Sequence, residues 1–309
     1  MPSRRLRRSL AAPALVALVA LAACGGDDAS TDDTTDATTD DPTNDTTDAT
    51  TGDTSPTTTA APSDKPEVEF PGADPTELTL TELEAGTGAE AVEGDTIVVD
   101  YVGVRAVDGV EFDNSYDPGT PFAMKIGAGQ VIPGWDQGLV GVRAGGRYQL
   151  DIPADLAYGE EGSGELIRPG DSLTFVVDVR ALVPAGAEAP DVTVEGADPV
   201  DALETEDLVT GEGTAAAEGD TVAIHLVAYN GADGAVLDNS WEGGQPITIL
   251  LQGDSTLSGL VEGIAGMQPG GRRMMRIPFE QAWGADGNEA IGLPASTDLV
   301  LVIDLFAAW

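Results

Sequence analysis

Residues 130–138 read Gln-Val-Ile-Pro-Gly-Trp-Asp-Gln-Gly. A proline suits the start of a helix, because the N–H group that it lacks would have no partner there. We therefore expect one short helix at Gly134–Val140. Runs rich in β-branched and aromatic residues flank this segment and indicate strands; they are Thr96–Val104, Phe122–Ile126, Arg147–Ile152 and Leu173–Leu182. Several strands around one helix predict an antiparallel α+β fold.

The same pattern returns later in the chain. The segment 93–96, Glu-Gly-Asp-Thr, recurs at 218–221, and Ala-Tyr-Gly at 157–159 recurs as Ala-Trp-Gly at 282–284. The predicted elements of the second copy are strands at Thr221–Tyr229, Ile247–Leu251, Arg272–Ile277 and Leu299–Phe306, and a helix at Gly259–Ala265. A repeat this long indicates two copies of one domain rather than a solenoid. We place the first domain at residues 68–184, a linker at 185–191 and the second domain at 192–309.

The charge of the chain narrows its possible partners. Lys and Arg number 14 against 54 Asp and Glu, which gives a net charge of −40. Nucleic acid is not expected as a partner, because phosphate binding needs clusters of basic residues. With one cysteine, the chain can form no internal disulfide. A Ser-His-Asp triad would have to use the single histidine, His225, which lies in a predicted strand and is interpreted as structural.

The N-terminus has the features of an export signal. Four arginines precede an apolar run, Leu10–Ala23, which is shorter than a membrane span and fits a signal peptide. The sequence Leu21-Ala22-Ala23-Cys24-Gly25 resembles a bacterial lipobox. We therefore expect a signal peptide at 1–23, a lipid on Cys24 and an extracytoplasmic protein anchored to the cell membrane. The alternative is an ordinary signal peptide with a chance cysteine.

Residues 24–67 form a predicted tether that is dominated by Thr and Asp. Such a composition offers too little apolar surface to bury, so we expect disorder. The simplest interpretation is a solvated spacer between membrane and domains. Thr-rich tracts with proline are also typical of O-glycosylated stalks, and this alternative stays open.

Several short motifs of the first domain occur in a characteristic order. They are Val-Asp-Tyr-Val-Gly at 99–103, Asp-Gly-Val-Glu-Phe-Asp-Asn-Ser at 108–115, the segment 130–138, Ala-Tyr-Gly at 157–159 and Leu-Thr-Phe at 173–175. Together they resemble the FKBP family of peptidyl-prolyl cis-trans isomerases, the macrolide-binding immunophilins, over roughly residues 78–182. The resemblance implies an antiparallel sheet wrapped around a short helix, with a pocket between them. It also implies proline-containing polypeptide clients, macrolide ligands such as rapamycin, and no cofactor.

The resemblance also assigns roles to residues. Trp135 would be the floor of the pocket, Asp113 and Tyr158 its polar groups, and the backbone N–H of Ile132 would hold a ligand carbonyl. The walls would be Tyr101, Phe112, Phe122, Val131, Ile132, Ile167 and Phe175. Taken singly, each aromatic could instead be a core residue, and the segment 113–115 an ordinary turn.

The second domain departs from this pattern. At the positions of Tyr101, Phe112, Phe122, Trp135, Tyr158 and Phe175 it has Leu226, Leu237, Ile247, Leu260, Trp283 and Leu301. Asp113 is retained as Asp238. We therefore expect the second domain to keep the fold with weak or no activity. The predicted function is isomerisation that assists the folding of exported proteins at the outer face of the membrane. The alternative is a non-catalytic chaperone or peptide-binding surface lipoprotein.

Overall fold

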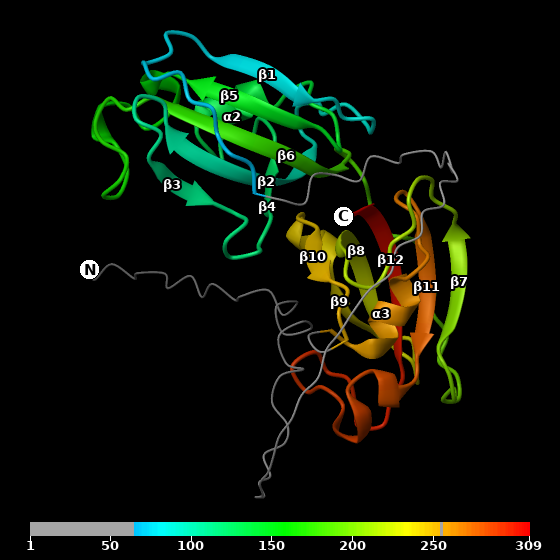
Figure 1. The fold of residues 1–309 in the computed structure, drawn as a ribbon. Coiled ribbons are helices and arrows are strands. Elements are labelled where there is room, and N and C mark those ends of the chain that lie inside the picture. The colour runs from blue at the N-terminus through cyan, green and yellow to red at the C-terminus, as the bar shows by residue number, and fades with distance from the viewer. Residues whose placement is uncertain (1–64, 254–255) are drawn as a thin grey trace, which may run out of the picture.

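The computed structural model describes residues 65–253 and 256–309. The predicted signal peptide, Cys24 and nearly all of the predicted tether lie outside the described residues. The described chain forms two six-stranded antiparallel sheets, one after the other along the sequence (Figure 1). No helix in the described ranges is long and apolar enough to cross a membrane.

The first sheet has the strand order β1-β5-β6-β2-β3, and β4 also pairs with β2. Two short 3₁₀ turns, at Ala154–Leu156 and Gly159–Glu161, follow β5. The elements of this half are β1 (Thr79–Glu84), β2 (Thr96–Arg105), β3 (Glu111–Asn114), β4 (Phe122–Lys125), α2 (Pro133–Gly138), β5 (Arg147–Ile152) and β6 (Leu173–Val183).

The second sheet repeats this topology. Its order is β10-β8-β12-β11-β7, and β9 pairs with β8. The 3₁₀ turns of this half lie at Ser240–Gly243, Phe279–Gln281 and Gly284–Asp286. Its other elements are β7 (Glu204–Val209), β8 (Thr221–Asn230), β9 (Val236–Asn239), β10 (Ile247–Leu250), α3 (Ser258–Ile264), β11 (Arg272–Ile277) and β12 (Leu299–Ala308).

The predicted α+β class and the predicted long strands are confirmed, with ends that move by a few residues at most. The strands that the sequence analysis did not predict are β1, β3, β7 and β9. Every residue of β1 and β7 is exposed, so neither shows the apolar alternation that marks a half-buried strand. β3 and β9 have only four residues each, too few to show a period.

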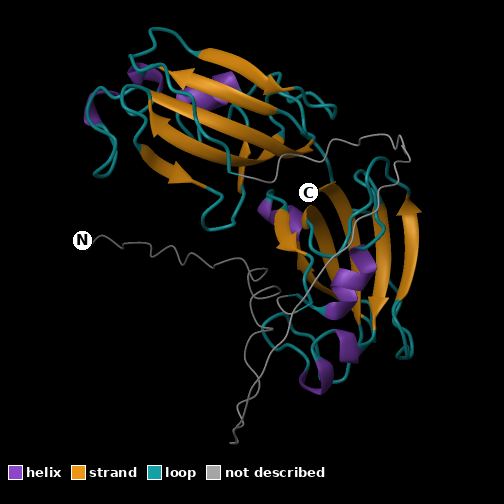
Figure 2. Cartoon of the chain, viewed as in Figure 1, coloured by secondary structure: helices purple, strands orange, loops and turns teal. Residues whose placement is uncertain are grey.

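Each half has one short helix packed against its sheet (Figure 2). Two glycines make this close packing possible in α2. A Cβ atom on Gly134 would lie 2.4 Å from Ile152 Cγ2, and one on Gly138 would lie 2.7 Å from Leu150 Cδ2. In α3, Gly259 approaches Ile277 and Gly263 approaches Met275 in the same way. The glycines therefore fix the depth at which the residue between them, Trp135 or Leu260, enters the core.

The two apolar cores are separate. The core under α2 takes its residues from positions 78–182, and the core under α3 takes its residues from positions 203–308. Since each core and each sheet is complete within one half, each half has what an independently folding domain needs.

The other face of the first sheet carries buried charges. Arg180 Nε lies 2.7 Å from Asp100 Oδ2, and Arg147 Nε lies 2.6 Å from Asp178 Oδ1. The hydroxyl of Ser115 donates to Asp100 Oδ1 at 2.7 Å, and that of Tyr116 donates to Asp178. These side chains form a paired polar network, as burial of charge requires.

In the second domain, aromatic rings take the place of much of this network. His225 stands at the position of Asp100 and stacks on Trp241, with ring centroids 4.1 Å apart and planes 19° apart. Phe306 stands at the position of Arg180 and meets His225 edge-on at 5.7 Å. His225 Nδ1 lies 2.8 Å from the hydroxyl of Ser240, and both residues are buried. This burial supports the structural interpretation of His225.

These faces of the two sheets meet. Val98 and Ala181 of the first domain pack with Ala223, Phe306 and Trp309 of the second. The guanidinium carbon of Arg180 lies 5.8 Å from the centroid of the Trp309 ring, within the range of a cation–π contact. The C-terminal strand of the second domain therefore lies against β6 of the first.

We expect His225 to make the second domain sensitive to acid. Burial lowers the pKa of His225 from 6.5 to about 4, so the unfolded chain binds a proton that the folded domain refuses. The free energy of unfolding is then full above about pH 6.5 and decreases as the pH falls towards 4, by at most about 3 kcal/mol, because one pKa unit corresponds to about 1.4 kcal/mol. Urea unfolding across this range, compared with His225→Phe, checks this.

The comparison with His225→Phe isolates the imidazole, because Asp304, its cross-strand neighbour, titrates in both proteins. Burial raises the pKa of Asp304, which has the opposite effect on the pH dependence. An equal loss of stability in both proteins on acidification would show that His225 is not the cause.

Candidate functional site

Three aromatic rings surround the ring of Trp135, a buried residue of α2. The rings of Tyr101, Phe122 and Phe175 lie 5.3, 6.1 and 5.2 Å from the Trp135 ring, all nearly perpendicular to it. They come from three different strands, β2, β4 and β6. Edge-to-face contacts of this kind hold rings in fixed positions. We call these four residues and Phe112, which lies 5.5 Å from Phe175, the ring cluster.

A glycine in β2 makes room for this cluster. A Cβ atom on Gly103 would lie 2.7 Å from both Phe112 and Phe175. Any larger residue there would displace one ring or the other. The motif Tyr-Val-Gly at 101–103 thus supplies one ring and the space for two more.

The remaining predicted wall residues lie at the same core. Ile167 is buried in it, and Val131 and Ile132 pack against it. Ile132 is the N-cap residue of α2, where a helix leaves backbone N–H groups without partners. The cluster reaches solvent at Phe122, whose side chain is 40% exposed. The structure thus brings the predicted apolar residues together, while their part in catalysis stays a prediction.

The polar groups of the site centre on Tyr101. Its hydroxyl donates a hydrogen bond to Asp113 Oδ2 at 2.6 Å. Burial, and then this bond, raise the pKa of Tyr101 well above its usual value, so the phenol stays protonated. Tyr158 precedes the turn Gly159–Glu161, is 40% exposed, and is close enough to influence Tyr101 electrostatically. The indole Nε1–H of Trp135 is buried without a hydrogen-bond partner in the described chain.

The sequence analysis missed the role of Asp136. Its carboxylate accepts the backbone N–H groups of Gly127, at 3.0 Å, and Gly129, at 2.8 Å. Both glycines have positive φ angles, which glycine adopts without strain. Asp136 thereby fixes the loop between β4 and α2 that carries Val131 and Ile132. The signal that could have shown this is an acidic residue in the first turn of a helix that follows a glycine-rich loop.

The equivalent site of the second domain is aliphatic. Leu226, Leu260 and Leu301 are buried in its core, and Leu237, Ile247 and Trp283 pack against them. Leu226 has no hydroxyl to replace that of Tyr101. Accordingly, Asp238 Oδ2 is buried without a hydrogen bond from any described residue, and burial raises the pKa of Asp238.

We expect Tyr101→Phe to lower kcat/KM for a proline tetrapeptide about tenfold. The substitution keeps the ring and removes one charge-assisted hydrogen bond, which typically contributes about 1.5–3 kcal/mol. Tyr148→Phe is the matched control, because its hydroxyl is engaged elsewhere and accepts the N–H of Arg143 at 2.9 Å. Equal effects of the two substitutions on kcat/KM would show that the hydrogen bond between Tyr101 and Asp113 makes no specific contribution to catalysis.

The chain is similar to several known proteins. The family described as "FKBP-type peptidyl-prolyl cis-trans isomerase" matches residues 88–180 and 212–306. An FK506-binding protein of Streptomyces anulatus is 50% identical over 121 residues, which are 38% of this chain and 98% of that protein. The bovine peptidyl-prolyl cis-trans isomerase FKBP10 is 34% identical over 237 residues, 75% of this chain and 37% of that protein. The solved structure of FkpA from Escherichia coli is 38% identical, covers 40% of this chain and 55% of its own, and has a TM-score of 0.33.

The two matched segments together cover more than half of the chain, and each contains one of the two sheets with its helix. The chain therefore belongs to the FKBP-type peptidyl-prolyl cis-trans isomerase family, with two tandem domains of the family fold. Isomerisation of the peptide bond that precedes proline is the function that this membership supports.

Proposed function

We propose that the first domain catalyses cis–trans isomerisation of Xaa–Pro bonds and that the second contributes little or no catalysis. The observation that carries this proposal is the ring cluster around Trp135, which the second domain replaces with leucines and an isoleucine. Both domains have the sheet and the helix, so the different side chains at the site would account for a difference in activity between the domains.

The chemistry follows from the electronic structure of the amide. Rotation about the bond is opposed by about 18–20 kcal/mol of resonance energy, because twisting breaks the partial double bond. The planar amide carries negative charge on oxygen and positive charge on nitrogen, and the twisted amide carries much less of both. An apolar site lined by rings therefore favours the twisted state over the planar one.

This mechanism needs no nucleophile and no proton transfer. The carboxylate of Asp113 is occupied by the hydroxyl of Tyr101, so the pair acts by orienting the prolyl segment. The backbone N–H of Ile132, at the start of α2, is the donor that we assign to a carbonyl of the client. Since Glu160 and Glu161 follow Tyr158, clients that are not acidic beside the proline should be preferred.

We place this activity at the outer face of the cell membrane, on exported proteins. The support is the lipobox-like sequence around Cys24, the apolar run before it and the Thr/Asp-rich segment after it. Palmitate labelling of cells that express the chain, with Cys24→Ala as the control, tests the anchor. Labelling that is unchanged in Cys24→Ala would rule out Cys24 as the lipid site.

The test of the activity is an isomer-specific assay of the full chain on a proline tetrapeptide, with and without rapamycin. We expect catalysis that rapamycin abolishes, because the names of the bacterial relatives indicate that they bind a macrolide, FK506. Absence of catalysis would favour the second candidate, a non-catalytic peptide-binding lipoprotein. That candidate already has a basis in the aliphatic site of the second domain.

A further inference from the structure

Two border strands, one from each domain, line a cleft between the domains. β4 pairs only with β2, and β10 pairs only with β8, so each has one edge that no described strand covers. The cleft has a volume of about 590 Å³. It is lined by Pro121, Phe122, Ala123, Met124 and Gln130 of the first domain and by Gln245, Pro246 and Thr248 of the second.

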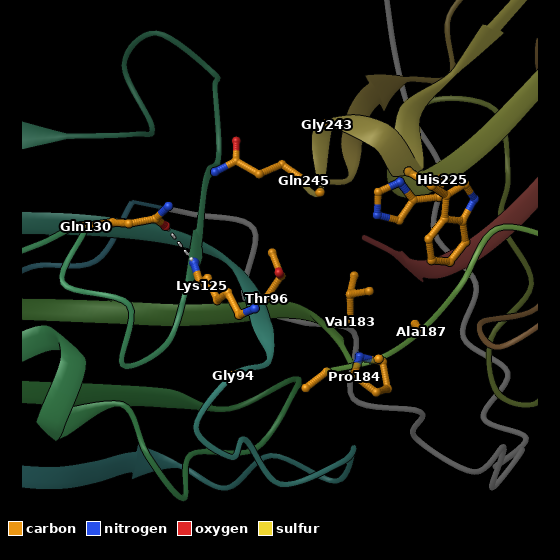
Figure 3. Close-up of a pocket in the computed structure, with 14 residues that line it drawn as sticks. Gly94, Thr96, Lys125, Gln130, Val183, Pro184, Ala187, His225, Gly243 and Gln245 are labelled. Carbon is orange, nitrogen blue, oxygen red and sulfur yellow. Dashed lines mark hydrogen bonds between the residues drawn. The ribbon is translucent and has the colours of Figure 1, made fainter.

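A second cavity lies next to the first. It has a volume of about 350 Å³, and Gln130 and Gln245 line both cavities. Its walls include Thr96 and Lys125 from the first domain and His225 from the second, on either side of the chain at Pro184 (Figure 3). We call these two adjacent cavities together the interdomain groove.

The interdomain groove begins at the proposed catalytic site. Phe122 lines the groove, and its ring is also part of the ring cluster, 6.1 Å from Trp135. A polypeptide whose proline lies on the ring cluster can therefore pass over Phe122 and enter the groove without a break. A client is the occupant that this continuity favours.

The edge of β4 offers a backbone acceptor inside the groove. The carbonyl of Ala123 accepts a hydrogen bond from the side-chain amide of Gln245 at 3.2 Å. This amide occupies the place where the N–H of an added strand would donate. Gln245 is exposed, so its side chain can turn away and release the carbonyl. Unpaired strand edges bind extended peptides in this way.

The charge in the groove indicates what the client carries there. Lys125 lines the groove, and its ammonium group makes no ion pair with any described residue. In a chain with a net charge of −40, an unpaired lysine is a local site for an acidic side chain. Lys125 is three residues from Phe122, about 10 Å along a strand. The acidic residue of the client would thus be about three positions from its proline.

We propose that the interdomain groove binds the client segment next to the proline as an extended strand along β4, with an acidic side chain beside Lys125. This inference rests on the proposed function of the first domain and adds a role for the second. The second domain supplies the opposite wall of the groove through Gln245, Pro246 and Thr248. The second domain then serves client binding without a ring cluster of its own.

The test compares a proline tetrapeptide with a peptide of about ten residues, enough to fill β4 as well as the site. The longer peptide carries glutamate three positions from proline. For the full chain we expect kcat/KM to be about tenfold higher on the longer peptide, which corresponds to one or two net hydrogen bonds. Thr248→Arg places a large side chain in the groove and should remove this advantage while leaving the tetrapeptide rate unchanged.

Thr205→Arg is the matched control, because it makes the same change on β7, the opposite border of the same sheet. It should keep the tenfold advantage. Lys125→Gln should lose the preference for glutamate over glutamine at the third position. An advantage that persists in Thr248→Arg, or that disappears equally in Thr205→Arg, would overturn the proposal.

Failure of the proposed function would be distinguishable from failure of the groove. If the full chain isomerises neither peptide, binding of the labelled longer peptide is measured by fluorescence anisotropy. Binding that Thr248→Arg weakens and Thr205→Arg does not would then support the groove without catalysis. Equal binding by the two variants would overturn it.

Discussion

Replacing Trp135 with leucine, the residue at the equivalent position of the second domain, will lower kcat/KM for a proline tetrapeptide about a hundredfold. The Trp135 ring makes edge-to-face contacts with three other rings of the ring cluster. Each contact contributes about 0.5–1.5 kcal/mol beyond simple burial, and a hundredfold change corresponds to about 2.7 kcal/mol. Leucine fills the core but cannot hold Tyr101, Phe122 and Phe175 perpendicular to one apolar surface.

Two controls separate this loss from a loss of folding. Val179→Ala removes buried atoms from the same core and leaves every ring of the ring cluster present, so it should destabilise the first domain with little change in kcat/KM. Leu260→Met makes a volume-conserving change at the equivalent position of the second domain and should leave the rate unchanged. A Trp135→Leu protein that is as active as Val179→Ala would refute the assigned role of the ring cluster.

Removing the guanidinium of Arg180 will destabilise the first domain by about 3–5 kcal/mol, the usual cost of breaking a buried ion pair. Arg180 bonds to Asp100 at 2.7 Å and lies 3.5 Å from Asp178, and all three side chains are nearly inaccessible. Arg180→Ala therefore leaves two buried carboxylates with one fewer cation, and it also removes the contact with Trp309. Urea unfolding of the full chain, followed by probes in the first domain, measures the change.

The matched control is Arg143→Ala, which breaks an ion pair with Glu90 whose two side chains are about half exposed. Pairs of this kind contribute about 0–1 kcal/mol. If Arg143→Ala and Arg180→Ala cost the same, burial of the network contributes nothing to the stability of the first domain.

The sequence predicted those parts of the fold that local patterns encode. The long strands follow from β-branched runs, the first helix from the proline before Gly134, and the second helix from its place in the repeat. β1 and β7 could not be predicted in this way, because they are exposed along their whole length and join the sheet only by pairing with β5 and β11. The signal for such strands is tertiary, and the residues of the strand itself do not carry it.

The burial of the charged side chains on the other face of the first sheet could not be predicted from the sequence either. Asp100 and Arg180 are 80 positions apart in the sequence. Because successive side chains of a strand point to opposite faces of the sheet, these two charged residues would be expected to face solvent. They are buried because β12 and Trp309 of the second domain cover this face of the sheet. Contact between the two domains cannot be inferred from either repeat alone.

The apolar part of the candidate site was predictable, because its residues come from motifs whose order is characteristic of a family. The structure brings Tyr101, Trp135 and Phe175 within about 6 Å of one another. The loop anchor Asp136 and the unpaired Trp135 Nε1 were not predicted, since both depend on where the loop and the helix lie relative to the sheet.

The most direct measurement is proline isomerisation by each domain separately, as residues 65–186 and 187–309, followed by NMR exchange on a proline peptide. Each half contains a complete sheet and core, so both should fold. We predict that the first half accelerates exchange, that rapamycin abolishes this acceleration, and that the second half leaves exchange at the uncatalysed rate. Acceleration by the second half alone, or by neither half, would contradict the assignment of catalysis to the ring cluster around Trp135.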